Sequence, residues 1–158
     1  MTLVVIGAGR VGGSLAKAAE RAGLACRLVR RNDGWDALDA DAGHPIVVAT
    51  RNDDLDSVLA RVPQRRLVDL VFTQNGMLRP WLAANGLSDN TRGLLFFAVP
   101  ARGDDLTPGG TSPFCGLHAE AVVAMFDVLG IPSVAVTDKV FATVELEKLV
   151  WNSAFGLL

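Results

Sequence analysis

Cysteine is scarce in this sequence. Of its 158 residues only Cys26 and Cys115 are cysteines, and each stands alone among apolar residues. A disulfide framework or a cysteine-based metal site would need more cysteines at fixed spacings, so both are excluded. The two thiols are therefore expected to be free and buried, in a reducing compartment.

Charge is scarce as well, and neither sign dominates. Charged residues make up 20% of the chain and the formal net charge is −2, which leaves no basic face for a sequence-blind nucleic-acid binder. Long apolar runs are also missing, so no membrane span is predicted. The first seven residues lack the basic segment and the cleavage site of a signal peptide, which predicts a cytoplasmic protein. Neither histidine has a carboxylate or a nucleophile at a spacing typical of a catalytic site. His44 is expected to be a surface residue, and His118 is expected to start a helix.

What the chain does have is apolar sequence in short, regular runs. Half of its residues are hydrophobic, which is ample for one core, and the chain is too short for two domains of ordinary size. Runs of β-branched residues alternate with segments of helical period, which is the pattern of parallel strands joined by helices. The sequence predicts an α/β fold of Rossmann type, with a doubly wound, mainly parallel sheet and helices on both faces.

The expected elements can be placed by their residue ranges. Strands are expected at 3–6, 25–29, 45–49, 67–71, 93–99, 114–117 and 134–136. Helices are expected at 11–22, 52–60, 77–84, 119–129 and 139–158, and a turn or hairpin at 102–113. The last helix ends in the apolar residues Phe155, Leu157 and Leu158, which indicates that it packs against a further domain or another subunit.

A glycine-rich turn follows the first expected strand and opens the first expected helix. It fits the pattern G-x-G-x-x-G with Gly7, Ala8, Gly9, Arg10, Val11 and Gly12. Gly7 permits a tight turn, Gly9 lets a pyrophosphate approach the backbone, and Gly12 lets the helix pack on the strand. The free N–H groups at the helix start would hold the phosphate charge. This context favours a dinucleotide-binding turn over a strand-to-helix turn that only accommodates glycine.

Two arginines, Arg30 and Arg31, stand at the end of the second expected strand. NAD-binding proteins usually carry an acidic residue there for the ribose 2′-hydroxyl, whereas guanidinium groups grip a 2′-phosphate through charge-assisted hydrogen bonds. The pair therefore favours NADP over NAD. The alternative is that both arginines are solvated loop charges and that Asp33 binds the ribose.

Polar residues also follow the third and fourth expected strands, as Thr50-Arg51 and Gln74-Asn75-Gly76. Ligands of open α/β sheets bind outside these carboxyl ends. Gly76 allows an unusual turn that would bring the Asn75 amide close to a ligand. An ordinary Asn-Gly turn explains the second group equally well.

On the last expected helix, Glu145, Lys148 and Asn152 share one face. A stripe of acid, amine and amide can line a cleft, where Lys148 would polarise a carbonyl and donate a proton. The alternative is a solvated face with a weak Glu145–Lys148 ion pair.

In their order along the chain, these motifs resemble those of the ketopantoate reductases, the NADP-dependent 2-dehydropantoate 2-reductases. The resemblance rests on the glycine-rich turn, Arg31, the stretch Gln74-Asn75-Gly76-Met77, residues 93–98 before Arg102-Gly103, and residues 145–152. It extends over essentially the whole chain but matches only the N-terminal half of the family's architecture.

The resemblance implies a reaction and roles for three residues. Hydride would pass from NADPH to the carbonyl of a 2-oxo acid, converting 2-dehydropantoate to pantoate for pantothenate biosynthesis. Lys148 matches the catalytic lysine, which donates a proton to the developing alkoxide. Asn75 matches an amide near the nicotinamide and substrate, and Asn152 matches a substrate-contacting asparagine.

The resemblance also implies how the cofactor is held. Arg31, with Arg30, matches the 2′-phosphate site. Thr50 and Arg51 match a pair of cofactor-binding residues. The family often has lysine where this chain has Arg51, so the positive charge is the same but the shape of the charged group differs.

Two departures from the family pattern leave a second function open. Gly156 stands where a further asparagine is expected, and the family's helical C-terminal domain is missing. Residues 1–138 are then an NADP-binding domain, and residues 139–158 are the start of an absent domain. The chain is expected to assemble through this helix as a homo-oligomer such as a dimer, or with a partner chain. The alternatives to a reductase are an isolated NADP-binding or sensing module without turnover, and a related Rossmann reductase with another substrate.

Overall fold

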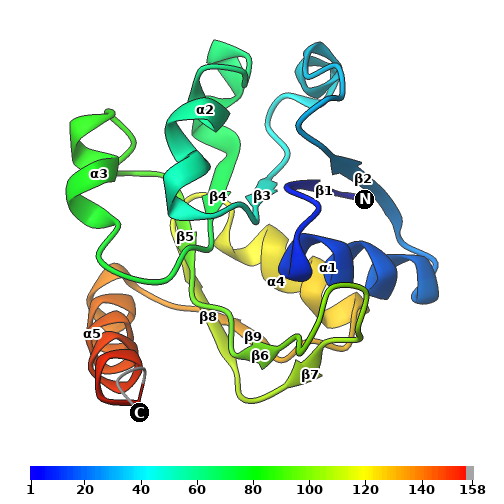
Figure 1. Ribbon diagram of the computed structural model, residues 1–158. Helices are drawn as coiled ribbons and strands as arrows, with labels where there is room; N and C mark the ends of the chain where they lie inside the picture. Colours follow the sequence, from blue (N-terminus) through cyan, green and yellow to red (C-terminus); the bar gives the residue numbers. More distant parts are fainter. Residues whose placement is uncertain (156–158) are drawn as a thin grey trace.

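The computed structural model describes residues 1–155. Its main sheet has seven strands in the order β2-β1-β3-β4-β5-β8-β9, and β6 and β7 form a separate hairpin (Figure 1). The strands are β1 (Thr2–Ile6), β2 (Ala25–Val29), β3 (Ile46–Val48), β4 (Leu70–Phe72), β5 (Thr91–Gly93), β6 (Phe97–Ala98), β7 (Thr107–Pro108), β8 (Ser112–Cys115) and β9 (Ser133–Ala135). The α-helices are α1 (Arg10–Arg21), α2 (Leu55–Leu59), α3 (Arg79–Ala84), α4 (Ala119–Val128) and α5 (Asp138–Phe155). Short 3-10 helices are η1 (Asp36–Asp41), η2 (Asn52–Asp54) and η3 (Gln64–Asp69).

The sheet is parallel throughout except where β5 pairs with β8. Alternate residues of β1 point to opposite faces, and both faces are apolar. Leu3 and Val5 pack in one core with residues of α1 and α4, whereas Val4 and Ile6 pack in a second core with residues of α2 and α3. Figure 1 shows these two helix pairs on opposite sides of the sheet. The predicted Rossmann-type α/β fold is confirmed.

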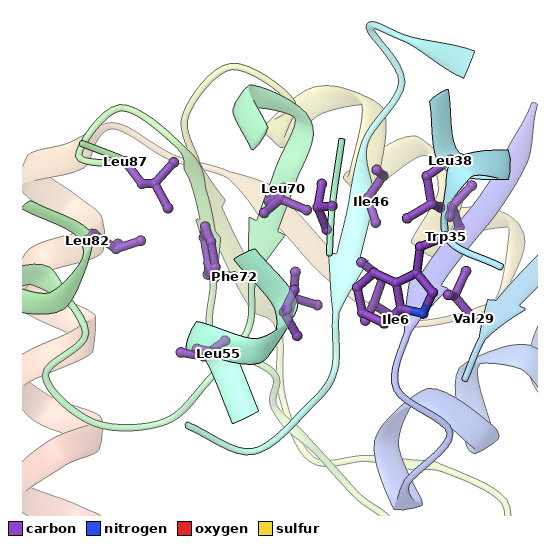
Figure 2. Close-up of a cluster of buried hydrophobic side chains, with 14 of the residues drawn as sticks. Ile6, Val29, Trp35, Leu38, Ile46, Leu55, Leu70, Phe72, Leu82 and Leu87 are labelled. Atoms are coloured by element: carbon purple, nitrogen blue, oxygen red, sulfur yellow. The ribbon is translucent and has the colours of Figure 1, made fainter. Parts of the chain in front are cut away.

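The second core extends to the edge of the sheet at β2. Figure 2 shows Leu70 near the middle of this core, with Ile6 and Ile46 toward one end and Leu82 of α3 toward the other. Trp35 closes the end nearest β2, where it is 7% exposed and donates its indole N–H to the Arg30 carbonyl at 3.0 Å. This indole fixes the loop that follows β2.

Three expected strands are shorter than predicted. The strand expected at 45–49 loses one residue at each end, and the other two are shortened for local reasons. Residues 67–69 belong to η3. Arg66 and Asp69 form a buried ion pair there, and its spacing of three residues fits a helical turn and not an extended strand. The run 93–99 leaves the regular ladder soon after Gly93. The N–H of Leu94 still donates to the Pro113 carbonyl of β8, but the N–H of Phe96 donates to the side-chain hydroxyl of Ser112 at 2.9 Å and not to a backbone carbonyl. The expected helix at 52–60 begins as η2, and no side chain caps it.

The last helix, α5, packs beside the β8 side of the sheet (Figure 1). Its Phe141 is buried against Leu94 and Cys115. Gly156, Leu157 and Leu158, which entered the sequence-based expectations, lie outside the described residues. Within residues 1–155, no helix is both long enough and apolar enough to be a membrane span.

The two cysteines are free and differ in burial. Cys115 is buried and Cys26 is half-buried. Burial raises the pKa of both thiols, so neither is a ready nucleophile at neutral pH.

Candidate functional site

The glycine-rich turn joins β1 to α1 at the carboxyl edge of the sheet. Gly7 has a φ of +105°, a conformation that favours glycine, and its N–H donates to the Val29 carbonyl at 2.9 Å. A Cβ on Gly12 would lie 1.8 Å from the Gly7 carbonyl oxygen. The first turn of α1 therefore sits directly against the glycine loop, with no room for a side chain between them.

The start of α1 carries no acidic residue in its first turn. Its N-cap is Gly9, where a Cβ would meet no atom within 4 Å. The helix start is thus an open, positively polarised end that can accept a phosphate group.

A cavity of about 260 Å³ lies between the glycine-rich turn, the end of β2 and helix α2. It takes in six predicted site residues, namely Gly7, Ala8, Gly9, Arg31, Thr50 and Arg51. Its other walls include Trp35, Asp54 and Arg61. The cavity thus combines an apolar wall with three guanidinium groups and one carboxylate.

A second cavity of about 590 Å³ continues along the same edge of the sheet. It takes in the predicted residues Arg10, Val11 and Asn75, and it shares Gly9, Ala49, Thr50 and Arg51 with the first cavity. Because they share these residues, the two cavities adjoin as one groove across the ends of β1, β3 and β4, beside the glycine-rich turn.

Two buried oxygens in the groove lack hydrogen-bond partners among the described residues. They are Thr50 Oγ1 and Gln74 Oε1. The Gln74 amide nitrogen is fully used, because it donates to the Val48 and Thr50 carbonyls at 3.0 and 3.1 Å. Buried polar atoms normally find a partner, so this part of the groove has unmet hydrogen-bonding capacity.

The structure separates the residues that follow β2. The Arg31 side chain is 79% exposed, lines the first cavity and pairs with Asp54 at 3.0 Å. The described cavity walls include neither Arg30 nor Asp33. The Asp33 carboxylate accepts the Arg30 backbone N–H at 2.7 Å and so closes the local turn. This contact weakens the alternative in which Asp33 binds a ribose.

Sequence reasoning missed Arg61, which follows α2. Its guanidinium lies 4.3 Å from the centre of the Trp35 ring and donates to the Arg31 carbonyl and, at 3.0 Å, to the Asp33 carbonyl. Nothing in the local sequence marks this arginine, since its partners are backbone atoms 28 and 30 residues away.

Lys148 lies beside the second cavity without lining it. Its ammonium donates to the Leu95 carbonyl at 2.7 Å and sits 4.5 Å from the centre of the Phe96 ring. Leu95 is itself a wall of the second cavity. Burial lowers the pKa of Lys148 to about 8, which places this amine in the range where it can exchange a proton.

The alternative interpretation of this helix face, a solvated face with a Glu145–Lys148 ion pair, is wrong at Glu145. This carboxylate is buried and binds Arg79 at 2.6 Å, with Arg92 at 3.7 Å. Arg79 and Arg92 belong to α3 and β5, so the carboxylate anchors α5 to the domain. Asn152, one turn beyond Lys148, is exposed, and neither described cavity includes it.

Asn75 lies on the wall of the second cavity, next to Gly76 with a φ of +97°. Its side chain is exposed, and its backbone carbonyl accepts a hydrogen bond from Asn52 at 3.2 Å. The Asn-Gly pair is therefore a turn that also faces the groove. Among residues 1–155, no group of three or more His, Cys, Asp or Glu side chains is arranged to hold a metal ion.

The fold and groove define a Rossmann-type domain, and comparison with solved structures gives the same class. The chain is similar to 2-dehydropantoate 2-reductase from Methylococcus capsulatus, with a TM-score of 0.67 and 18% identity over 98% of this chain and 62% of that one. It is also similar to a reductive aminase from Aspergillus terreus in complex with NADPH and ethyl-5-oxohexanoate, with a TM-score of 0.67 and 16% identity over 98% and 60% of the two chains. A third similar structure is that of D-mandelate dehydrogenase with NADH. Its TM-score is 0.58, and it is 14% identical over 86% of this chain and 55% of that chain.

At these identities the likeness is one of fold. No family model matches the chain, and no curated protein matches it. The chain spans 55 to 62% of the length of the three solved structures.

Proposed function

We propose that the chain binds NADP(H) along the carboxyl edge of its sheet, as the cofactor-binding part of an oxidoreductase. The observation that carries this proposal is the cavity in which the glycine-rich turn meets Arg31, Arg51 and Arg61. Solved structures of the same fold hold NADPH or NADH, so the fold alone does not choose between the two. The charges at the end of β2 support NADP over NAD.

The described residues fit the phosphorylated cofactor. The open N-terminus of α1 would receive the diphosphate, because it is positively polarised and no acidic residue stands in its first turn. Three guanidinium groups against the one Asp54 carboxylate leave the first cavity net positive, which suits a 2′-phosphate better than a ribose hydroxyl. Arg31, with Arg30 beyond the cavity, would then face the phosphorylated ribose.

The reaction we propose is reduction of the carbonyl of a 2-oxo acid, with 2-dehydropantoate as the first candidate. The bound cofactor supplies the hydride. Lys148 would donate the proton that the developing alkoxide needs, since its amine lies next to the groove and is partly desolvated. Asn75 would face the reacting groups from the wall of the second cavity, and Asn152 would contact the substrate.

A second candidate function is cofactor binding without turnover. It is favoured by the exposure of Asn152, which neither described cavity includes. In this case residues 1–138 bind NADP(H), and residues 139–158 join them to a partner that completes a substrate site.

Titration with NADPH and NADH, followed by NADPH oxidation with 2-dehydropantoate, tests the two candidates. For an enzyme we expect Lys148→Met to lower turnover by about 100- to 10,000-fold while NADPH affinity is kept. Lys139→Met is the matched control, because Lys139 is an exposed lysine of the same helix. NADPH binding without turnover supports the binding module, and a chain that binds neither nucleotide contradicts both candidates.

The pH dependence gives a further check on Lys148. A general acid acts only while protonated, and burial lowers the pKa of this lysine to about 8. We therefore expect kcat/KM for the carbonyl substrate to fall as the pH rises through about 8. The Lys148→Met variant should lack this fall of kcat/KM at high pH. The same fall in that variant would mean that another group donates the proton.

We also propose that α5 assembles with a second copy of the chain. Leu146 and Val150 are 58% and 60% exposed on neighbouring turns of this helix, and exposed apolar faces of helices are commonly interfaces. Leu146→Glu is expected to convert a dimer to a monomer in light scattering. Val68→Glu, at an apolar residue of η3 that is 53% exposed, should leave the mass unchanged. A wild-type protein that is strictly monomeric would refute this assembly.

A further inference from the structure

Arg61 stands out because its charge is not neutralised. Among the described residues, its hydrogen bonds go to two backbone carbonyls, those of Arg31 and Asp33. Among the described residues it forms no ion pair, whereas Arg31 is paired with Asp54 and Arg51 with Asp53. The Arg61 guanidinium thus brings an uncompensated positive charge to the wall of the first cavity.

The same guanidinium is held in a fixed orientation. One face packs over Trp35, whose centre is 4.3 Å away, and Trp35 is buried in the core beside β2 (Figure 2). A planar guanidinium held by an aromatic ring and two acceptors loses little further entropy when it binds an anion.

Arg61 also determines where Arg31 lies. It is bonded to the carbonyl of Arg31 itself and to that of Asp33, two residues later. Trp35 ties the preceding carbonyl, that of Arg30, at 3.0 Å. The loop after β2 is therefore held by Arg61 and Trp35 in addition to the Asp33 turn, and Arg61 contacts it from the end of α2.

We propose that Arg61 is a specificity-determining residue for a phosphorylated adenosine ribose. It adds positive charge to the cavity and fixes the loop that presents Arg31. This inference rests on the proposed function, since it concerns the same groove. It assigns part of the selectivity for NADP(H) over NAD(H) to a residue other than Arg30 and Arg31 at the end of β2.

The test compares Arg61→Gln with Arg65→Gln by titration with NADPH and with NADH. Arg65 is a suitable control because it also binds across to the segment after β2, through the Asp39 carboxylate and the Asp39 carbonyl at 2.8 Å, but is not in the cavity wall. We expect Arg61→Gln to weaken NADPH binding by about 10- to 100-fold and NADH binding by about threefold at most. Arg65→Gln should change neither, and the salt dependence of NADPH binding should fall only in Arg61→Gln.

Two further measurements separate specificity from folding. Arg61→Lys keeps the charge but loses the planar fork, so it should restore part of the preference for NADPH. In an Arg31→Gln background, Arg61→Gln should have a smaller effect on NADPH than it has alone, because part of its action passes through Arg31. Equal loss of NADPH and NADH affinity in Arg61→Gln, or no loss of either, would overturn the inference while the proposed function stands. A wild-type chain that binds neither nucleotide would overturn both.

Discussion

Replacing Gly12 with alanine is expected to abolish NADPH binding and to lower the free energy of unfolding by about 1–3 kcal/mol. The added Cβ would lie 1.8 Å from the Gly7 carbonyl oxygen and 3.2 Å from a methyl group of Val5. The first of these is a backbone atom that cannot rotate away. The turn would have to open and move the helix start off the groove, so stability and binding are lost together.

The neighbouring Gly13 provides the matched control for this experiment. It lies in the same helix, yet a Cβ at this position would meet no atom within 4 Å. Gly13→Ala is therefore expected to raise the free energy of unfolding by about 0.5–1 kcal/mol and to keep NADPH affinity. Urea denaturation and nucleotide titration measure the two effects. Wild-type affinity in Gly12→Ala would show that the helix does not sit against the turn as described.

Replacing Arg66 with methionine is expected to destabilise the fold by about 3–5 kcal/mol, as happens when one partner of a buried ion pair is removed. The Arg66 side chain is 1% exposed and binds the Asp69 carboxylate at 2.7 Å and the His44 carbonyl at 2.8 Å. Asp69 is equally buried and also meets His118 at 3.0 Å. Without the guanidinium, this carboxylate would remain in the interior with less compensation.

The control for Arg66→Met is Arg65→Met. Arg65 is adjacent in sequence and also paired with an aspartate, but its side chain is 62% exposed. Because exposed ion pairs contribute little, we expect a loss of about 1 kcal/mol at most. Equal effects of the two substitutions in urea denaturation would mean that the Arg66–Asp69 contact does not stabilise the fold more than a surface pair.

The main features of the fold follow from local sequence. The runs 3–6 and 46–48 are apolar at every position, so they predict strands buried on both faces, and both lie in such strands. The expected strand 67–71 contains Asp69, and only its last two residues fall in β4. The glycine pattern predicted a strand-to-helix turn with a close approach at Gly12, and the packing around Gly12 confirms it. These signals are short-range, because they depend on the period of apolar residues and on the steric needs of one turn.

The environment of polar side chains was not predictable in the same way. His118 starts α4 as expected, but its ring is buried against Asp69, 49 residues earlier. The helical spacing suggests Lys148 as a partner for Glu145, yet Glu145 binds Arg79, 66 residues earlier. Each of these contacts joins elements that meet only when the sheet is complete, and no pattern in the sequence records them.

Local sequence was enough to predict the order of strands and helices along the chain, the glycine-rich turn and the arginines after β2, because periodicity and steric requirements act between near neighbours. Which charges remain uncompensated depends on the folded protein. It paired Arg31 with Asp54, buried Glu145 between two arginines, and brought Arg61 over Trp35 with its charge facing the cavity. Whether a charge is neutralised depends on distances across the fold, and these are fixed by packing rather than by spacing along the chain.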